Sequence, residues 1–111
     1  MRLLSILILV PALLGCGSSV PPDLKDSDPT VRIPAIHKSV RNRNQADEGR
    51  MVKDLNSEDP AVRFYAIEGL YRLTGQTLGY RYYDNEAQRQ MAIRKWEQWL
   101  ATRRSANSSA K

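Results

Sequence analysis

One feature of this 111-residue chain restricts its fold more than any other, a 14-residue pattern that occurs twice. Residues 23–36 (DLKDSDPTVRIPAI) and 54–67 (DLNSEDPAVRFYAI) are identical at 8 of 14 positions, and the second copy begins 31 residues after the first. A repeat of this length is typical of stacked helical hairpins. No segment shows sustained alternation of apolar and polar residues, so the sequence predicts an all-α fold without a sheet.

Each copy carries the same signal for the start of a helix. Asp28 and Asp59 each precede a proline, and this pair of residues is favoured at the N-cap and the first helical position. The expected helices cover 31 to about 40, 45–55, 62–73 and about 86–103, in two antiparallel pairs. One apolar face of the helix at 62–73 is expected to be buried, and it consists of Val62, Ala66, Leu70 and Leu73, widened by Phe64, Ile67 and Tyr71. Pro34 is expected to kink or shorten the first helix. The other end signals are Asn44, Gly75, Asn85 and Gln88.

The first 15 residues read as a signal peptide. The apolar stretch from 3 to 14 follows a positive charge, and its 12 residues are too few for a membrane span, which needs about 20. The sequence Leu13-Leu14-Gly15-Cys16 resembles the lipobox of bacterial lipoproteins, in which the cysteine thiol receives a diacylglycerol. The resemblance implies lipidation of Cys16, a tether at 16–22 and a place in the bacterial cell envelope. Gly17, where inner-membrane lipoproteins carry an aspartate, favours the outer membrane.

The repeated pattern L-x-x-x-D-P-x-V-R-x-x-A-I resembles short HEAT-like repeats, the type found in bacterial proteins related to phycobilin lyases. The stretch from Leu73 to Trp99 is similar to small envelope HEAT proteins of planctomycete-type bacteria. The resemblance covers about residues 23–103. It implies an α-solenoid fragment with two helical hairpins at 23–104. The small, polar residues of 105–111 predict a flexible tail after it. Because two units are few for a solenoid, the resemblance also implies that the last helix, a partner or self-association completes the core.

Composition excludes several kinds of site. A single cysteine and a single histidine rule out cysteine-built zinc sites and paired-histidine sites, so we expect neither a metal nor a cofactor. His37 is expected to be a surface or half-buried helix residue. The segment 75–79 has the glycines of a phosphate loop, but Tyr-Arg follows it instead of Lys-Ser/Thr, which argues against a nucleotide site. An enzyme of the helical lyase or glycosylase type would need Glu68 or Glu97 in a deep pocket.

Two sets of side chains are candidates for specific contacts. A ladder linking the two units is expected from Asp28, Arg32, Asp59 and Arg63, because such residues bond between adjacent units in HEAT-like proteins. A partner-binding surface is expected on the second helix of each pair and on the tyrosine-rich loop. Its candidate residues are Arg50, Lys53, Tyr80, Arg81, Tyr82, Tyr83, Arg94 and Trp99. In the structural interpretation, which we favour, one or two tyrosines only hold the loop in place, and Trp96 and Trp99 pack in the core.

These features favour a lipid-anchored, non-enzymatic module that binds an envelope protein, itself unidentified. The net charge of +5 supports an alternative, a basic module that binds nucleic acid or an anionic membrane surface. Export to the envelope argues against nucleic acid, and steep salt dependence would mark either ligand. A third interpretation is an accessory or regulatory subunit of an envelope enzyme. Self-association is a further option.

Overall fold

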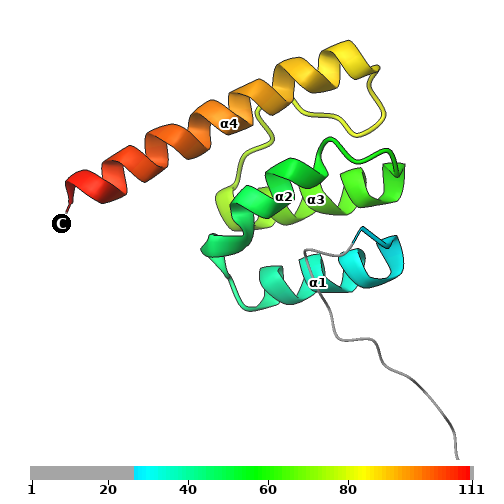
Figure 1. Ribbon diagram of the computed structural model, residues 1–111, viewed down its shortest axis with the longest axis horizontal. Coiled ribbons are helices and arrows are strands. Elements are labelled where there is room, and N and C mark those ends of the chain that lie inside the picture. The colour runs from blue at the N-terminus through cyan, green and yellow to red at the C-terminus, as the bar shows by residue number, and fades with distance from the viewer. Residues whose placement is uncertain (1–26, 111) are drawn as a thin grey trace, which may run out of the picture.

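The computed structural model describes residues 27–110. The expected signal peptide, the lipidated Cys16 and the tether at 16–22 lie outside the described residues. The elements are α1 (Pro29–Arg41), the 3-10 helix η1 (Gln45–Asp47), α2 (Glu48–Asp54), α3 (Pro60–Thr74) and α4 (Glu86–Ser109). Over the described range there is no strand, so the expected all-α fold is confirmed (Figure 1). None of these helices is long and apolar enough to cross a membrane.

The helix ends follow the capping signals of the sequence. The Asp28 carboxylate accepts a hydrogen bond from the Thr30 amide (2.9 Å), and the Asp59 carboxylate accepts one from the Ala61 amide (2.7 Å). A proline follows each aspartate at the start of the helix. The Asn85 side chain caps α4 in the same way. Local capping chemistry therefore fixes where α1, α3 and α4 begin.

Two of the first three helices differ in detail from the expected ones. Asn44 caps the short 3-10 helix η1, and regular α-helix begins only at Glu48, so the helix expected at 45–55 is divided. Helix α1 continues through Pro34. This proline lies in the second turn with its side chain exposed, and it removes only the hydrogen bond to the Thr30 carbonyl.

Helix α4 is longer than expected. It runs to Ser109, through most of the segment for which the sequence predicts a flexible tail. Residues 105–109 include no glycine or proline to end the helix. Their hydroxyls donate to carbonyls four residues earlier, as Ser105 does to Ala101 and Ser109 does to Ser105, both at 3.1 Å. The expected tail is therefore an exposed extension of α4.

The helices are arranged with a difference between the two pairs (Figure 1). Helix α2 runs opposite to α1, and α3 runs in the same direction as α1. After α3, the 11-residue connection 75–85 returns along the molecule before α4 begins. As a result α4 runs in the same direction as α3 and is antiparallel to α2. The first pair is antiparallel as expected. The second pair, α3 and α4, is parallel, so the expected antiparallel arrangement is wrong there. The reason is that the connection 75–85 returns along the molecule before α4 begins.

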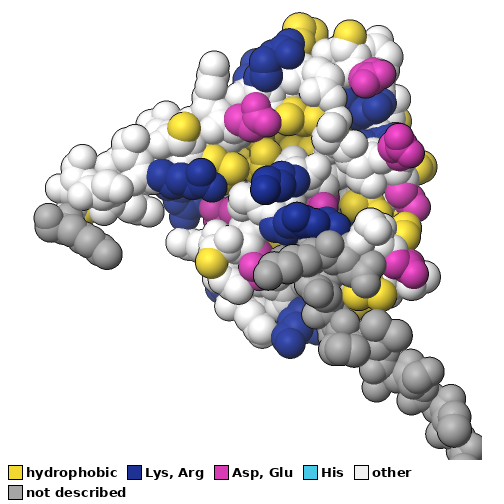
Figure 2. Space-filling view, in the orientation of Figure 1, with side chains coloured by type: hydrophobic (Ala, Val, Ile, Leu, Met, Phe, Trp, Pro, Cys, Tyr) yellow, Lys and Arg dark blue, Asp and Glu magenta, His cyan; other side chains and the backbone are white. Residues whose placement is uncertain are grey.

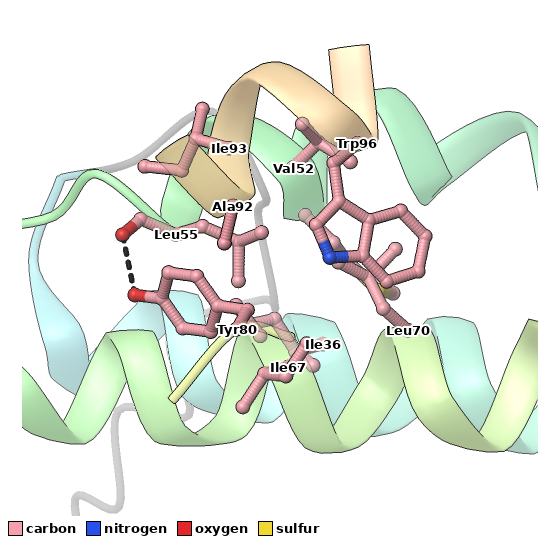
Figure 3. Close-up of a cluster of buried hydrophobic side chains, with 11 residues drawn as sticks. Ile36, Val52, Leu55, Ile67, Leu70, Tyr80, Ala92, Ile93 and Trp96 are labelled. Carbon is pink, nitrogen blue, oxygen red and sulfur yellow. Dashed lines mark hydrogen bonds between the residues drawn. The ribbon is translucent and has the colours of Figure 1, made fainter. Parts of the chain in front are cut away.

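The core lies where α2, α3 and α4 meet, with α1 covering its other side (Figure 3). Its largest fully buried side chains are Ile36, Met51, Leu55, Leu70 and Trp96. On α3 the buried positions include Val62, Ala66 and Leu70, the stripe that the helical spacing predicted. Leu73 packs against the same core and is only partly buried.

Gly69 lets three helices approach closely. A Cβ atom at this position would lie 3.1 Å from Ile36 Cγ2 on α1 and 3.1 Å from the Met51 sulfur on α2. Both distances are shorter than ordinary van der Waals contact. Any side chain on this face of α3 would therefore require Ile36 and Met51 to shift by a few tenths of an ångström.

Candidate interaction surface

The two repeated arginines both stabilise the fold, but they use different partners. Arg32 is buried and forms an ion pair with Asp54 at the end of α2. Arg63 donates to three backbone carbonyls, those of Ser57 (2.8 Å), Glu58 (3.0 Å) and Tyr82 (3.1 Å). This corrects the expected ladder of Asp28, Arg32, Asp59 and Arg63. The end of α2 brings Asp54 to Arg32, the connection 75–85 brings a carbonyl to Arg63, and each aspartate caps its own helix.

Asp54 is a buried carboxylate whose burial no local sequence signal indicates. It is 4% exposed, and its Oδ2 atom has no hydrogen-bond partner among residues 27–110. Burial raises its pKa to about 6, although the charges of Arg32 and Arg50 act in the opposite direction. Together with these arginines and Lys53, it lines a polar depression of about 260 Å³. Its ion pair with Arg32 links α1 to α2, which gives it a structural role.

The tyrosines of the connection 75–85 divide into one that is buried and two that reach the surface. Gly75 ends α3 in the left-handed conformation (φ 74°). The Tyr80 side chain then turns inward, where its hydroxyl donates to the Leu55 carbonyl (2.6 Å; Figure 3). It is 3% exposed, and burial raises its pKa to about 12. Tyr80 therefore belongs to the core, and its assignment to a partner-binding surface is wrong, whereas Tyr82 is half-buried and Tyr83 is exposed.

The tryptophans of α4 serve packing. Trp96 is fully buried, and its indole N–H donates to the Thr77 carbonyl (3.0 Å), which ties the connection 75–85 to α4. Trp99 is half-buried, with its ring centroid 5.4 Å from that of Trp96. The Arg103 guanidinium lies 4.9 Å from the Trp99 ring centroid and also donates to Glu48 (2.6 Å). The expected core role of Trp96 is confirmed, and Trp99 lies at the edge of the core.

A connected row of aromatic rings crosses α3 from α1 to the connection 75–85. The centroid distances along it are 5.0 Å for His37–Tyr65, 5.2 Å for Tyr65–Phe64, 5.2 Å for Phe64–Tyr82 and 5.2 Å for Tyr82–Tyr83. All four pairs meet edge to face, the arrangement that the ring quadrupoles favour. We call these residues, with Tyr71, the aromatic surface. Contacts between neighbouring rings therefore hold the row in place in the free protein.

Much of the aromatic surface is open to solvent. Phe64 is 37% exposed, Tyr71 52% and Tyr83 67%. Among the described residues one other large hydrophobic side chain, Met91, is exposed to a similar degree, and it lies on α4. Three of these four side chains therefore gather in one place, which makes this face the candidate interaction site.

Two shallow depressions indent the aromatic surface. The larger, of about 320 Å³, is lined by Phe64, Tyr71, Tyr82 and Tyr83 together with Arg81. The smaller, of about 150 Å³, is lined by His37, Phe64, Tyr65 and Arg72. Glu68 lines both depressions, Arg72 lines the smaller and Arg81 the larger, and these groups form the ion pairs Glu68–Arg72 (3.8 Å) and Arg81–Asp84 (3.2 Å). An apolar centre with a polar rim is the usual composition of a protein–protein interface.

Only part of this surface was predicted from the sequence. Arg81, Tyr82 and Tyr83 were expected in it, and the expected place of His37 on a helix surface is confirmed. Phe64 and Tyr71 were expected on the buried face of α3, although both are exposed. The signal was present in the spacing, because Phe64, Glu68 and Tyr71 share one helical face and the charged residue between the two rings points to solvent.

The other predicted contact residues lie away from the aromatic surface. Arg50 and Lys53 are on α2, and Arg94 is exposed on α4. The structure thus separates the predicted residues into two regions, the connection 75–85 with α3, and the α2–α4 side. The candidates for an enzymatic carboxylate are separated as well. Glu68 forms an ion pair on the aromatic surface, and Glu97 is exposed on α4.

No group of three metal-ligating side chains that could hold an ion occurs within residues 27–110. Comparisons with protein-family models, with characterised proteins and with solved structures give no match for this chain. The resemblance to HEAT-like repeats and to lipoproteins stays a prediction from the residues themselves.

Proposed function

We propose that this protein is a lipid-anchored, non-enzymatic, HEAT-like module that binds another protein of the bacterial cell envelope through its aromatic surface. The observation that carries the proposal is the concentration of Phe64, Tyr71 and Tyr83 on one exposed face. The core of this small domain buries two aromatic side chains, Tyr80 and Trp96, almost completely. Rings left in water next to such a core favour burial against a partner.

The chemistry of the surface fits a protein ligand. Tyrosine and arginine are the residues most often found at the energetic centre of protein interfaces, together with tryptophan. Here Arg81 lies beside Tyr83, with the guanidinium 6.0 Å from the ring centroid. The edge-to-face contacts hold Phe64 and Tyr82 in place in the free protein. Less conformational entropy is lost when preorganised side chains bind, so a modest area can give specific binding.

Site-specific photo-crosslinking in the producing cells tests the proposal. The full chain would carry benzoylphenylalanine at Tyr83 in one strain, at Tyr71 in a second and at Met91 in a third. Met91 is the matched control because it is an exposed hydrophobic residue outside the aromatic surface, with 53% exposure against 52% for Tyr71. We expect Tyr83 and Tyr71 to capture the same envelope protein and Met91 not to capture it.

A further substitution distinguishes docking from chance proximity. Phe64→Ala in the Tyr83 strain should reduce the crosslinked product, because Phe64 supports Tyr82 and lines both depressions. Equal products from the Tyr83, Tyr71 and Met91 strains would contradict the proposal. If the captured protein is an enzyme, its activity with and without this chain shows whether the module acts as an accessory subunit.

The membrane anchor needs its own experiment. Growth with radioactive palmitate should label the chain, and Cys16→Ser should abolish the label and release the protein from the membrane fraction. Labelling that persists in the Cys16→Ser variant would refute the lipid anchor while leaving the binding proposal in place.

A further inference from the structure

A groove on another part of the molecule separates α2 from α4. Its lining includes the apolar side chains of Val52, Ile93 and Leu100, and its volume is about 390 Å³. Val52 and Ile93 are buried and Leu100 is half-buried, so these side chains form a floor instead of projecting outward. Figure 2 shows hydrophobic side chains on this face between the positions of α4 and α2, with Lys and Arg side chains gathered around them.

Contacts near the two ends of the groove keep α2 and α4 at a fixed separation. Near the start of α4, Gln90 donates to the Asn56 side chain (2.5 Å). Further along α4, Arg103 donates to the buried Glu48 (2.6 Å). The lining on α4 extends from Gln90 to Arg104, and 14 helical steps span about 21 Å. The groove is therefore preformed, and it is long enough for about four helical turns or six extended residues of a partner.

The charges along the groove are mainly positive. Lys53 and Arg104 line it and are exposed, and neither forms an ion pair with a described residue. The Arg104 guanidinium lies beside Gly49, where a Cβ atom would be 3.4 Å from Nη2. Arg50 lines the adjoining depression that shares Lys53 and Asn56 with the groove. Among the described residues of the lining, Glu97 is the one that is acidic.

We propose that this groove binds an acidic, amphipathic segment of a partner protein. Leucine-like side chains would cover Val52, Ile93 and Leu100, and carboxylates would lie beside Lys53 and Arg104. The apolar floor distinguishes this ligand from a free anion, which needs no such floor. The positive rim distinguishes it from a basic or neutral segment, because electrostatic complementarity selects the sign of the partner. The groove does not include any residue of the aromatic surface, so the proposal goes beyond the function proposed above.

A peptide titration tests the sign of the ligand. The probe is a fluorescein-labelled 14-residue helix with leucine on one face and glutamate elsewhere, and its partner probe carries lysine in place of glutamate. Fluorescence anisotropy with the full chain should show binding of the glutamate peptide that weakens as salt is raised, and much weaker binding of the lysine peptide. Equal affinity for both peptides, or no binding of the glutamate peptide, would overturn the proposal.

Charge variants test the location. Lys53→Glu and Arg104→Glu should each weaken binding of the glutamate peptide roughly 3- to 10-fold, and Glu97→Gln should strengthen it by a factor of about 2 to 5. Lys95→Glu is the matched control, because Lys95 is an exposed cation of α4 outside the groove lining. Circular dichroism confirms that each variant keeps its helices. If Lys95→Glu weakens binding as much as Lys53→Glu does, only the net charge matters and the groove is not the site.

Two further measurements separate peptide binding in the groove from binding at the aromatic surface and from binding to a membrane. Tyr83→Ala should leave affinity for the glutamate peptide unchanged, so failure of the aromatic surface and failure of the groove are distinguishable. Vesicles of phosphatidylglycerol provide the second measurement. If the vesicles bind the chain, lose affinity with Lys53→Glu and Arg104→Glu, and displace the peptide completely, the groove faces an anionic membrane and the peptide proposal is overturned.

Discussion

The two repeated segments make a controlled comparison within one chain. Both begin a helix with an aspartate cap and a proline, and both place an arginine four residues after the aspartate. Yet Arg32 is buried against a carboxylate, whereas Arg63 is half-buried against carbonyl oxygens. Helix α1 lies at the edge of the stack and α3 packs against both α1 and α2. The shared Asp-Pro pair therefore fixes the same helix start in both copies, while position in the stack decides which groups each side chain contacts.

The largest effect should separate the two arginines. Arg32→Ala leaves the buried Asp54 carboxylate without its counter-charge and is expected to cost about 3–5 kcal/mol of unfolding free energy. Arg63→Ala removes hydrogen bonds to backbone carbonyls and is expected to cost about 1–2 kcal/mol. Urea unfolding followed by circular dichroism measures both. Equal losses would show that the two positions are energetically equivalent after all.

A smaller difference is expected at Gly69 and Lys38, which each lie two residues after the end of a copy and are 31 residues apart. Gly69→Leu pushes a side chain into Ile36 and Met51 and should cost about 1–3 kcal/mol. Lys38→Leu changes an exposed position and should stay within about 0.5 kcal/mol of the wild type. Thermal unfolding of the two variants side by side provides the measurement, and a tolerant Gly69 would refute the close approach of the three helices.

The raised pKa of Asp54 predicts how the stability of the protein depends on pH. Its pKa in the folded state, about 6, is above the ordinary value of 3.8, so between these values the folded state binds more protons than the unfolded state. The Asp54 contribution to stability is therefore fully present below pH 3.8 and lost as the pH rises through 6, by roughly 3 kcal/mol. Subtracting the stability profile of Asp54→Asn from that of the wild type isolates this slope. A difference profile that rises with pH would mean that the Arg32 pair outweighs burial.

The smallest effect should be the one that the two copies share. Asp59→Ala removes the cap of α3 and is expected to cost about 1 kcal/mol. Asp28→Ala removes the corresponding cap of α1 and should lower the melting temperature as well. Differential scanning calorimetry gives both midpoints. If Asp28→Ala leaves the melting temperature unchanged, the two copies are similar in sequence but their caps do not contribute equally to stability.

Local signals predicted much of the fold, and side chains that depend on distant contacts were predicted poorly. Asp28, Asp59 and Asn85 act on amides two or three residues away, so their roles follow from the sequence. Tyr80 and Tyr83 are three residues apart in one loop, and only the path of that loop past Leu55 decides which is buried. The same path decides the direction of α4. Composition and capping signals contain no information about it.

The exposure of the aromatic surface was unpredictable for a related reason. Phe64 and Tyr71 are aromatic residues on a helix that needs one buried face. Periodicity alone could not show that Val62, Ala66 and Leu70 are enough to form that face, which leaves the two rings exposed. The Asp54 partner of Arg32 and the Tyr82 partner of Arg63 likewise lie 22 and 19 residues away, on segments whose packing the repeat does not specify. The candidate site could be located on the tyrosine-rich loop from the sequence, but its extension across α3 required the structure.

The contacts of Arg103 with Trp99 and Glu48 provide an intrinsic fluorescence probe of the molecule. Both tryptophans of the chain lie on α4, next to each other. Indole emission is sensitive to a nearby cation and to water, so the intrinsic fluorescence of the unlabelled protein reports on how α4 is seated, through Trp99 against α2 and through Trp96 against the connection 75–85. A ligand that spreads these helices would shift the spectrum, and one that docks on the far side of α3 would leave it unchanged.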